Sequence, residues 1–210
     1  MNIAFIEPAS KQAVFFYEIS KYFPSNIYPV FMSSNPKVIS RLRKIGANVL
    51  DLDKLRPSKE VPSIAEIEAS KGPLIRMKFV GDRKVEERAF FVYRRLSRII
   101  DELSISFIVV WGGTGLETSI ASHLISKKER GGTIFCQNGY FPQTIQVDTE
   151  GSNYWSSITP KIETEIEKLT FDNNFYEELM RVISNYKKGE NIIDFDPPYN
   201  HCYMQFQNLL

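Results

Sequence analysis

The stretch SFIVVWGGTG, Ser106 to Gly115, decides the fold that the sequence predicts. It is a continuous apolar run that ends in glycines, as expected for a central parallel strand covered on both faces. A helical segment, Leu116 to Lys128, follows it, and Gly131-Gly132 separate this helix from a second strand, TIFCQ. The pattern predicts a strand–helix–strand unit whose two strands lie in one parallel sheet.

The N-terminal third repeats this alternation of strands and helices. Apolar runs predict strands at Asn2–Pro8, Asn26–Met32 and Ala47–Leu52. Pro29 weakens the second of them or places it at a sheet edge. A helix capped by Ser10 is expected at Lys11–Tyr22.

A second helix is expected after Asn35, with Asn35 as its cap, Pro36 at its first position and Gly46 past its end. The stretch Pro57–Pro73 reads as an irregular surface loop, and Asp82–Leu103 as a long amphipathic helix. The predicted fold class is therefore α/β, a Rossmann-like parallel sheet with flanking helices.

The domain organisation predicted from composition has three parts. Residues 1–190 form one Rossmann-like domain, which ends in a polar helix from Pro160 to Lys188. Residues 191–200, NIIDFDPPYN, form a linker because two prolines and a run of turn formers cannot continue a helix. Residues 201–210 start another strand-like run.

Composition excludes several classes of protein. The 210 residues are 43% hydrophobic and carry a net charge of +1, which supports a packed core and gives no nucleic-acid signal. Two distant cysteines, Cys136 and Cys202, give neither a disulfide scaffold nor a metal site. Without a signal peptide or an apolar run of about 18 residues, the chain is expected in the cytoplasm.

Two segments leave carboxyl ends of predicted strands, where open parallel sheets bind ligands. The first carries Gly112, Gly113 and Gly115, which suit either a tight strand-to-helix turn or a phosphate-binding loop. The second turns at Asn138-Gly139 and leads to Asp148 at the end of a short alternating strand. Asp148 is either a turn or cap residue or a positioned functional carboxylate.

The two histidines give no site by themselves. His123 lies within a predicted helix and has no partner at metal-ligand spacing, so it reads as a packed or surface histidine. His201 lies in the C-terminal segment and belongs to no acid–nucleophile pattern. The serine of a nucleophile elbow is missing from GGTGLE.

The combination VVWGGTG…TIFCQNGYFPQTIQVDTEGSNYWSSI resembles the bacterial capsule polysaccharide biosynthesis family, which contains the retaining β-Kdo glycosyltransferases. The resemblance is strong over roughly Phe107 to Ser157. Gln137 stands where the family usually has Glu, and Gly112-Gly113 replaces a more typical Asn-Gly. The matching residues are Trp111, Asn138, Gly139, Pro142, Thr144, Asp148, Gly151 and Asn153.

The resemblance implies the N-terminal domain of a GT-B enzyme, with Asp148 as the catalytic nucleophile. The donor would be CMP-Kdo and the acceptor a lipid-linked glycan, with no further cofactor and no metal. The resemblance further implies that residues 201–210 are the first strand of a second, truncated domain, and that this domain, or a split partner chain carrying it, would hold CMP. It is also compatible with a peripheral location at the inner face of the bacterial inner membrane. The residues implied to bind substrate are Trp111, Gly112, Gly113, Gln137, Asn138, Gly139, Tyr140, Pro142, Thr144, Gly151 and Asn153.

Two other hypotheses stay open at this point. One is a non-catalytic remnant of such an enzyme that binds a glycan or a partner protein of the export machinery, or that has no role. The other is a nucleotide-binding regulator that uses the glycine-rich turn after Trp111.

Overall fold

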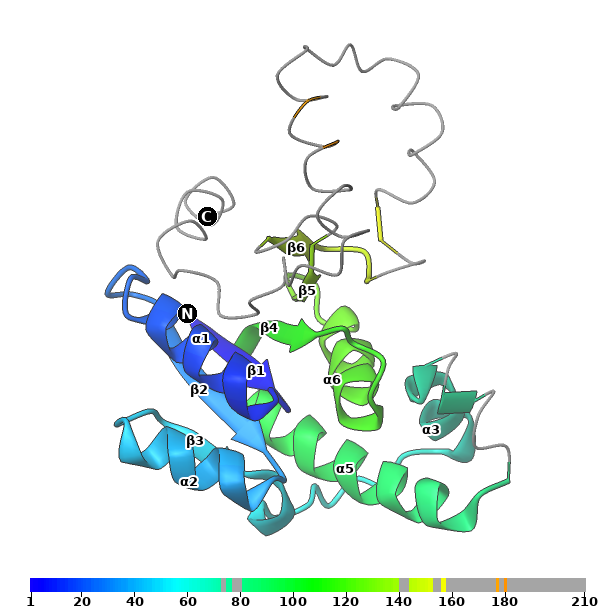
Figure 1. Ribbon diagram of the computed structural model, residues 1–210. Coiled ribbons are helices and arrows are strands. Elements are labelled where there is room, and N and C mark those ends of the chain that lie inside the picture. Colours follow the sequence, from blue (N-terminus) through cyan, green and yellow to red (C-terminus); the bar gives the residue numbers. More distant parts are fainter. Residues whose placement is uncertain are drawn as a thin grey trace.

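One six-stranded sheet organises the chain (Figure 1). The computed structural model describes residues 1–72, 75–76, 81–139, 144–152, 156–157, 177 and 180. The strand order is β3-β2-β1-β4-β5-β6, in which all neighbours are parallel except β6, which runs antiparallel to β5. The strands are β1 Asn2–Ile6, β2 Tyr28–Ser33, β3 Val49–Asp51, β4 Ile105–Trp111, β5 Gly132–Asn138 and β6 Ile145–Asp148.

Helices cover both faces of the sheet, as an α/β fold requires. Side chains from α1 (Ser10–Ser20) and α2 (Pro36–Lys44) pack on one face. Those from α5 (Arg83–Glu102) and α6 (Leu116–Ser126) pack on the other, where α3 (Ile64–Ser70) lies against both helices. A short 3-10 helix, η1 (Leu52–Lys54), follows β3. The α/β, Rossmann-like fold expected from the sequence is confirmed.

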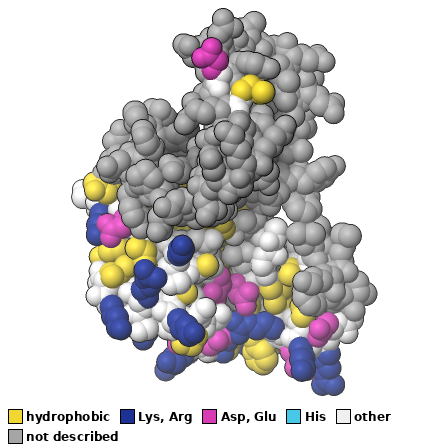
Figure 2. Space-filling view, viewed as in Figure 1, with side chains coloured by type: hydrophobic (Ala, Val, Ile, Leu, Met, Phe, Trp, Pro, Cys, Tyr) yellow, Lys and Arg dark blue, Asp and Glu magenta, His cyan; other side chains and the backbone are white. Residues whose placement is uncertain are grey.

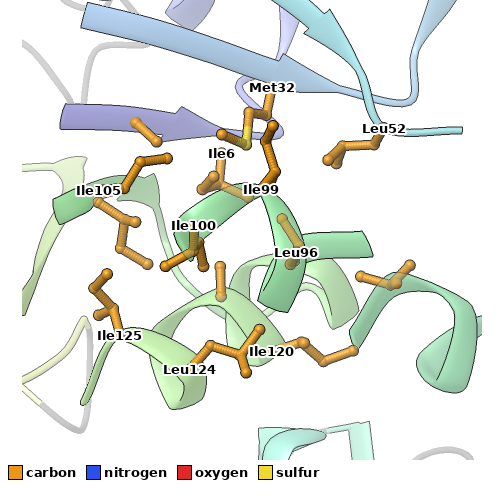
Figure 3. Close-up of a cluster of buried hydrophobic side chains, with 14 of the residues drawn as sticks. Ile6, Met32, Leu52, Leu96, Ile99, Ile100, Ile105, Ile120, Leu124 and Ile125 are labelled. Carbon is orange, nitrogen blue, oxygen red and sulfur yellow. The ribbon is translucent and has the colours of Figure 1, made fainter. Parts of the chain in front are cut away.

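Strand periodicity divides the core into two clusters. In β1, Ile3 and Phe5 face the α1–α2 side, whereas Ala4 and Ile6 face the α5–α6 side. The first cluster is aromatic, with the rings of Phe5 and Phe31 stacked at 4.7 Å between centroids. The second is aliphatic and includes Ile6, Met32, Leu96, Ile100, Ile105 and Ile120 (Figure 3).

The central strands and the long helices were predicted correctly, and β4 lies between β1 and β5 as its apolar run indicated. The expected edge position of the second strand was wrong, since β2 lies between β3 and β1. Pro29 is tolerated because β3 pairs only with Phe31–Ser33, so no β3 carbonyl faces the missing N–H of Pro29. On the side of β2 that faces β3, the Phe31 N–H donates to the Asn48 carbonyl at 2.8 Å.

The cap of α1 was also predicted wrongly. Ala9 is the N-cap residue, and its N–H donates to Oε1 of Gln12 at 2.8 Å. Ser10 is the first helical residue, and its hydroxyl accepts from Arg41 Nη1 at 3.0 Å. By contrast, the cap at Asn35 is confirmed, because its Oδ1 accepts from the Lys37 N–H at 3.0 Å.

The loop predicted at Pro57–Pro73 contains a helix, α3. It begins with a capping box in which Ser63 Oγ accepts from the Glu66 N–H and Glu66 Oε2 accepts from the Ser63 N–H. The predicted helix from Pro160 to Lys188, the linker at 191–200 and the strand at 201–210 lie outside the described residues.

The helices that follow β1 and β4 pack on opposite faces of the sheet. The connection that leaves β1 runs to α1 on one face, and the connection that leaves β4 runs to α6 on the opposite face. The carboxyl ends of β1 and β4 therefore form a topological switch point, which is the usual place for a ligand in an open α/β sheet.

The core makes a direct prediction about stability. Ile108 in β4 has no exposed surface, so Ile108→Ala is expected to lower the free energy of unfolding by about 2–5 kcal/mol. Ile64, with 83% of its surface exposed, provides the matched control, and Ile64→Ala is expected to change it by less than about 0.5 kcal/mol. Urea unfolding followed by circular dichroism measures both, and equal effects of the two substitutions contradict this core assignment.

Candidate functional site

A cavity of about 230 Å³ lies at the carboxyl ends of β4 and β5, on the α6 side of the sheet. Its walls come from the end of α3, the turn between β4 and α6, one side of α6, β5 and the loop after β6. Gly112, Gly113 and Gly151, three of the residues implied to bind substrate, line it. The cavity is also lined by residues that the sequence analysis did not assign to a site, Ser119, Ser122, His123, Glu150 and Ser152.

The glycine turn after β4 depends on the absence of side chains. Gly112 and Gly113 have φ of 73° and 68°, in the left-handed region that other residues rarely adopt. A Cβ on Gly113 would stand 2.6 Å from the ring of Phe135, so the turn lies directly on that ring. The N–H of Gly112 donates to the main-chain carbonyl of Cys136 at 2.7 Å, which fixes the turn to β5.

Trp111 points away from this cavity. Its ring contacts Phe16 and Phe15 of α1, at 6.0 and 6.4 Å between centroids. It belongs to the aromatic cluster on the opposite face of the sheet. The structure therefore separates Trp111 from the glycines that follow it in sequence.

The β5–β6 hairpin carries the next group of implied residues. Gln137 is buried, and its Nε2 donates to Oε1 of Gln146 on the paired strand at 2.6 Å. Asn138 is exposed at the end of β5, and the Gly139 N–H donates to the Thr144 carbonyl at 2.8 Å. Tyr140, Pro142 and Asn153 lie outside the described residues.

Asp148 ends β6, and its carboxylate is hydrogen-bonded to the loop that follows. Oδ1 accepts from the N–H groups of Glu150 and Gly151 at 2.7 and 3.3 Å. Oδ2 accepts from the N–H and the hydroxyl of Ser157 at 2.9 and 2.8 Å. With only 7% of its surface exposed, Asp148 holds the loop whose residues Glu150 to Ser152 line the cavity. This geometry is that of the turn or cap residue, one of the two roles the sequence left open.

Hydrogen bonding also sets the charge of Asp148. Burial alone raises the pKa of this carboxyl, but the hydrogen bonds from Glu150, Ser157 and Gly151 outweigh burial and lower its pKa below the ordinary value. Asp148 is therefore an ionised and immobilised carboxylate at neutral pH.

His123 lines the cavity from α6. Its Nε2 is buried, and among the described residues none is hydrogen-bonded to it. Burial, followed by the charge of Lys127, lowers the pKa of His123, so the ring is neutral at neutral pH. The sequence did not reveal this position because the cavity around His123 is built from segments far apart in the chain.

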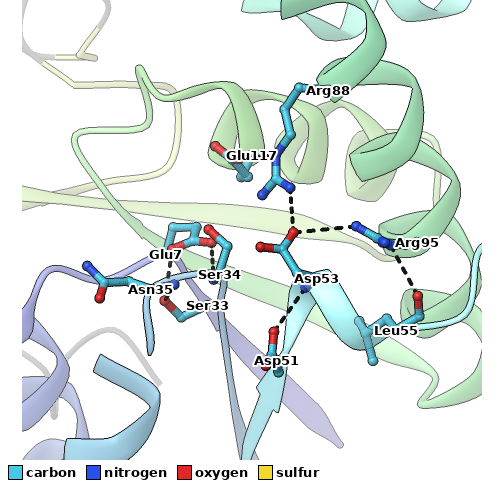
Figure 4. A network of polar contacts seen from close by, with 10 residues as sticks. All are labelled: Glu7, Ser33, Ser34, Asn35, Asp51, Asp53, Leu55, Arg88, Arg95 and Glu117. Atoms are coloured by element: carbon cyan, nitrogen blue, oxygen red, sulfur yellow. Dashed lines mark hydrogen bonds and ion pairs between the residues drawn. The ribbon is translucent and has the colours of Figure 1, made fainter. Parts of the chain in front are cut away.

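Glu7 is a second residue that the sequence reasoning missed. It follows β1 at the switch point, and its φ of 45° is a strained conformation for a residue with a side chain. Its carboxylate accepts from Ser33 Oγ at 2.9 Å and from the Ser34 N–H, which ties the end of β1 to the end of β2 (Figure 4). Burial raises the pKa of Glu7, despite these hydrogen bonds. A strand that ends in Glu-Pro at the carboxyl edge was the available signal.

Ion pairs join the helices of the α5–α6 side beside Glu7 (Figure 4). Arg88 of α5 pairs with Asp53 and, at 3.1 Å, with Glu117 in the first turn of α6. Arg95 donates to the Leu55 carbonyl at 3.1 Å and pairs with Asp53. In the space-filling view, acidic side chains lie directly beside basic ones near the centre of the face shown (Figure 2).

Comparisons with known proteins give no relative: no protein-family model, no curated protein and no solved structure matches the chain. Within the described ranges, no group of three or more His, Cys, Asp and Glu side chains could hold a metal ion. None of the helices in those ranges combines the length and the apolarity needed to cross a membrane.

The anchoring role of Asp148 can be tested by amide hydrogen exchange. Asp148→Ala leaves the amides of Glu150, Gly151 and Ser157 without their acceptor, so the free energy of local opening is expected to fall by about 1–3 kcal/mol. Asp148→Asn keeps an acceptor oxygen and should lose less. Glu60→Gln, at an exposed site in the segment between η1 and α3, is the control.

The lowered pKa gives the pH dependence of this anchor. The stabilisation is fully present above the ordinary carboxyl pKa of 3.8 and is lost as the pH falls through the lower folded pKa. Exchange of Gly151 that stays equally slow in Asp148→Ala contradicts the anchoring role.

A titration of His123 by NMR tests its environment. We expect a pKa below 6.5, and Lys127→Gln should raise it because the nearby positive charge is removed. The stability that comes from the neutral ring is present above pH 6.5 and is lost as the pH falls from 6.5 through the folded pKa. Lys128→Gln is the matched control, since Lys128 pairs with Asp101. A His123 pKa at or above 6.5 contradicts the assignment.

Proposed function

We propose that this chain is the N-terminal, Rossmann-like domain of a GT-B glycosyltransferase that uses CMP-Kdo and retains the anomeric configuration. The observation that carries the proposal is the cavity at the carboxyl edge of the sheet, which brings Gly112, Gly113 and Gly151 together beside the Asp148-anchored loop. Ligands of open α/β sheets bind at this edge.

The proposed chemistry starts from an oriented, ionised carboxylate. An Asp148 oxygen would bond to the anomeric carbon of Kdo while the bond from that carbon to the phosphate oxygen breaks, so CMP leaves with the electron pair. The acceptor hydroxyl oxygen would then attack the same carbon as its proton passes to a base, and the bond to Asp148 breaks. Two inversions give net retention.

The hydrogen bonds of Asp148 define what this mechanism requires. Oδ1 is held by two main-chain amides, which can orient the carboxylate throughout the reaction. Oδ2 accepts from the N–H and the hydroxyl of Ser157. For Oδ2 to attack a sugar, Ser157 must move away when the substrate binds.

The same occupancy of the carboxylate favours a second candidate function. If Ser157 stays in place, Asp148 remains an anchor, and the domain binds a carbohydrate in the cavity without transferring it. This candidate is the non-catalytic glycan-binding protein that the sequence left open.

The test is CMP release from CMP-Kdo by the full chain, alone and with the C-terminal domain of a retaining β-Kdo transferase, in the presence of a glycan acceptor. Asp148→Asn should reduce the rate by at least about a hundredfold because it removes the nucleophile but not the shape of the side chain. Intact-mass spectrometry should detect a covalent sugar on the wild-type chain and none on Asp148→Asn.

The controls separate the two candidates. Glu60→Gln should react as the wild type does, and Ser157→Ala should react at least as fast, since Oδ2 then loses a competing donor. CMP release that is unchanged in Asp148→Asn contradicts the nucleophile. No CMP release under any of these conditions, together with carbohydrate binding, supports the second candidate.

A further inference from the structure

We propose that the cavity selects a neutral, polyhydroxylated ligand about the size of one sugar ring, and that Nε2 of His123 makes the specificity-determining hydrogen bond to one of its hydroxyls. The inference rests on the proposed function only in taking a carbohydrate as the ligand. It applies to binding without transfer and, for the transferase, to a neutral sugar of the acceptor, because Kdo itself carries a carboxylate.

The serine hydroxyls around the cavity are set up as acceptors. Ser122 Oγ donates to the Thr118 carbonyl at 2.9 Å. Ser119 Oγ donates to the Gly113 carbonyl at 3.3 Å, and Ser152 Oγ donates to the Gly112 carbonyl. A hydroxyl has one proton and two lone pairs, so each of these groups has only acceptor capacity left for a ligand. A ligand must therefore supply donors, which sugar hydroxyls do and a phosphate or carboxylate does not.

The charges at the cavity point the same way. Among its lining residues in the described ranges there is no Lys or Arg, and Glu150 adds an acidic group. An anion would lose water without gaining a cationic partner, which is costly. The positive end of the α6 dipole is already offset by Glu117 in its first turn, and Glu117 is paired with Arg88. Neutral ligands are thus favoured over anionic ones.

His123 supplies the group that can distinguish one hydroxyl arrangement from another. Its Nε2 has no partner among the described residues, which is unusual for a buried polar atom. This nitrogen is shielded from solvent, so the imidazole ring must turn for Nε2 to reach a ligand hydroxyl in the cavity. Because burial and Lys127 keep the ring neutral, Nε2 can donate or accept, according to its tautomer, and a hydroxyl can match either. The ring of Tyr93, 6.4 Å away between centroids, lies beside it.

The size of the cavity limits the ligand. Its volume of about 230 Å³ is below the roughly 300–1,000 Å³ of sites for drug-sized molecules. One pyranose ring against Phe135 and the glycine turn is a suitable occupant, whereas a whole sugar nucleotide is not.

The experiment titrates the full chain with a panel of methyl glycosides of neutral hexoses and, as matched anions, with the methyl glucuronide, Kdo and CMP. NMR follows the imidazole nitrogens of His123 and the amides of Gly112, Gly113 and Gly151. At least one neutral glycoside should shift these signals, and methyl glucuronide should bind at least about tenfold more weakly than methyl glucoside. Binding of the anions as tight as that of the neutral glycosides, or no shift with any neutral glycoside, overturns the proposal.

Two variants of His123 test its role directly. His123→Leu should weaken binding of the neutral glycoside about threefold to tenfold, whereas His123→Gln should keep most of the affinity because it can still hydrogen-bond. Ser40→Ala, on the exposed side of α2, is the control and should bind normally. His123→Leu should not lower the unfolding midpoint, since it removes a buried polar atom. Unchanged affinity in His123→Leu overturns the specificity role.

The outcome is separable from that of the proposed function. Neutral glycoside binding without CMP release supports this inference and contradicts the transferase. CMP release that depends on Asp148, without any binding of neutral glycosides at the cavity, contradicts this inference and supports the transferase.

Discussion

The pairing of β1 with β4 is the interaction on which the rest of the structure depends. It joins two strands whose following helices lie on opposite faces of the sheet, α1 on one and α6 on the other, with a mainly aromatic cluster under the first and a mainly aliphatic cluster under the second. It also sets the ends of these strands side by side, Glu7 after one and Gly112 after the other. Without this ladder, the groups along the carboxyl edge of the sheet would not be held in fixed positions relative to one another.

The sequence was sufficient for features that are encoded locally. The apolar run of β4 and the periodicity of α5 predicted a buried central strand and a covering helix, and both are present. Position in the sheet was harder, because the tolerance of Pro29 depends on where β3 begins pairing. The site shows the same limit. The glycines could be found from the pattern, whereas the position of His123 beside a cavity depends on four other segments that the pattern cannot bring together.

Asp148 shows how a structural role and a chemical role can compete for one side chain. Four hydrogen bonds keep it ionised and fix the loop that forms one wall of the cavity. A carboxylate so well satisfied is a weak nucleophile, because attack requires part of that stabilisation to be given up. Its two oxygens have different partners among the described residues: main-chain amides hold Oδ1, and Ser157 occupies Oδ2. If Asp148 acts as the proposed nucleophile, its reactivity depends on Ser157, nine positions along the chain.

The central ladder has a consequence for how the chain reaches its native topology. Ala4 pairs with Val30 on one side and with Ile108 on the other, so the second contact closes a loop four times as long. Loop-closure entropy makes the longer connection about 1.2 kcal/mol more costly to form in the disordered chain. The segment from β1 to β3 can thus assemble from near neighbours, and so can β4, α6 and β5, whereas the ladder that joins the two halves of the sheet needs the longer closure. The union of the two halves, and not the formation of either half, therefore carries the larger entropic cost of reaching this topology.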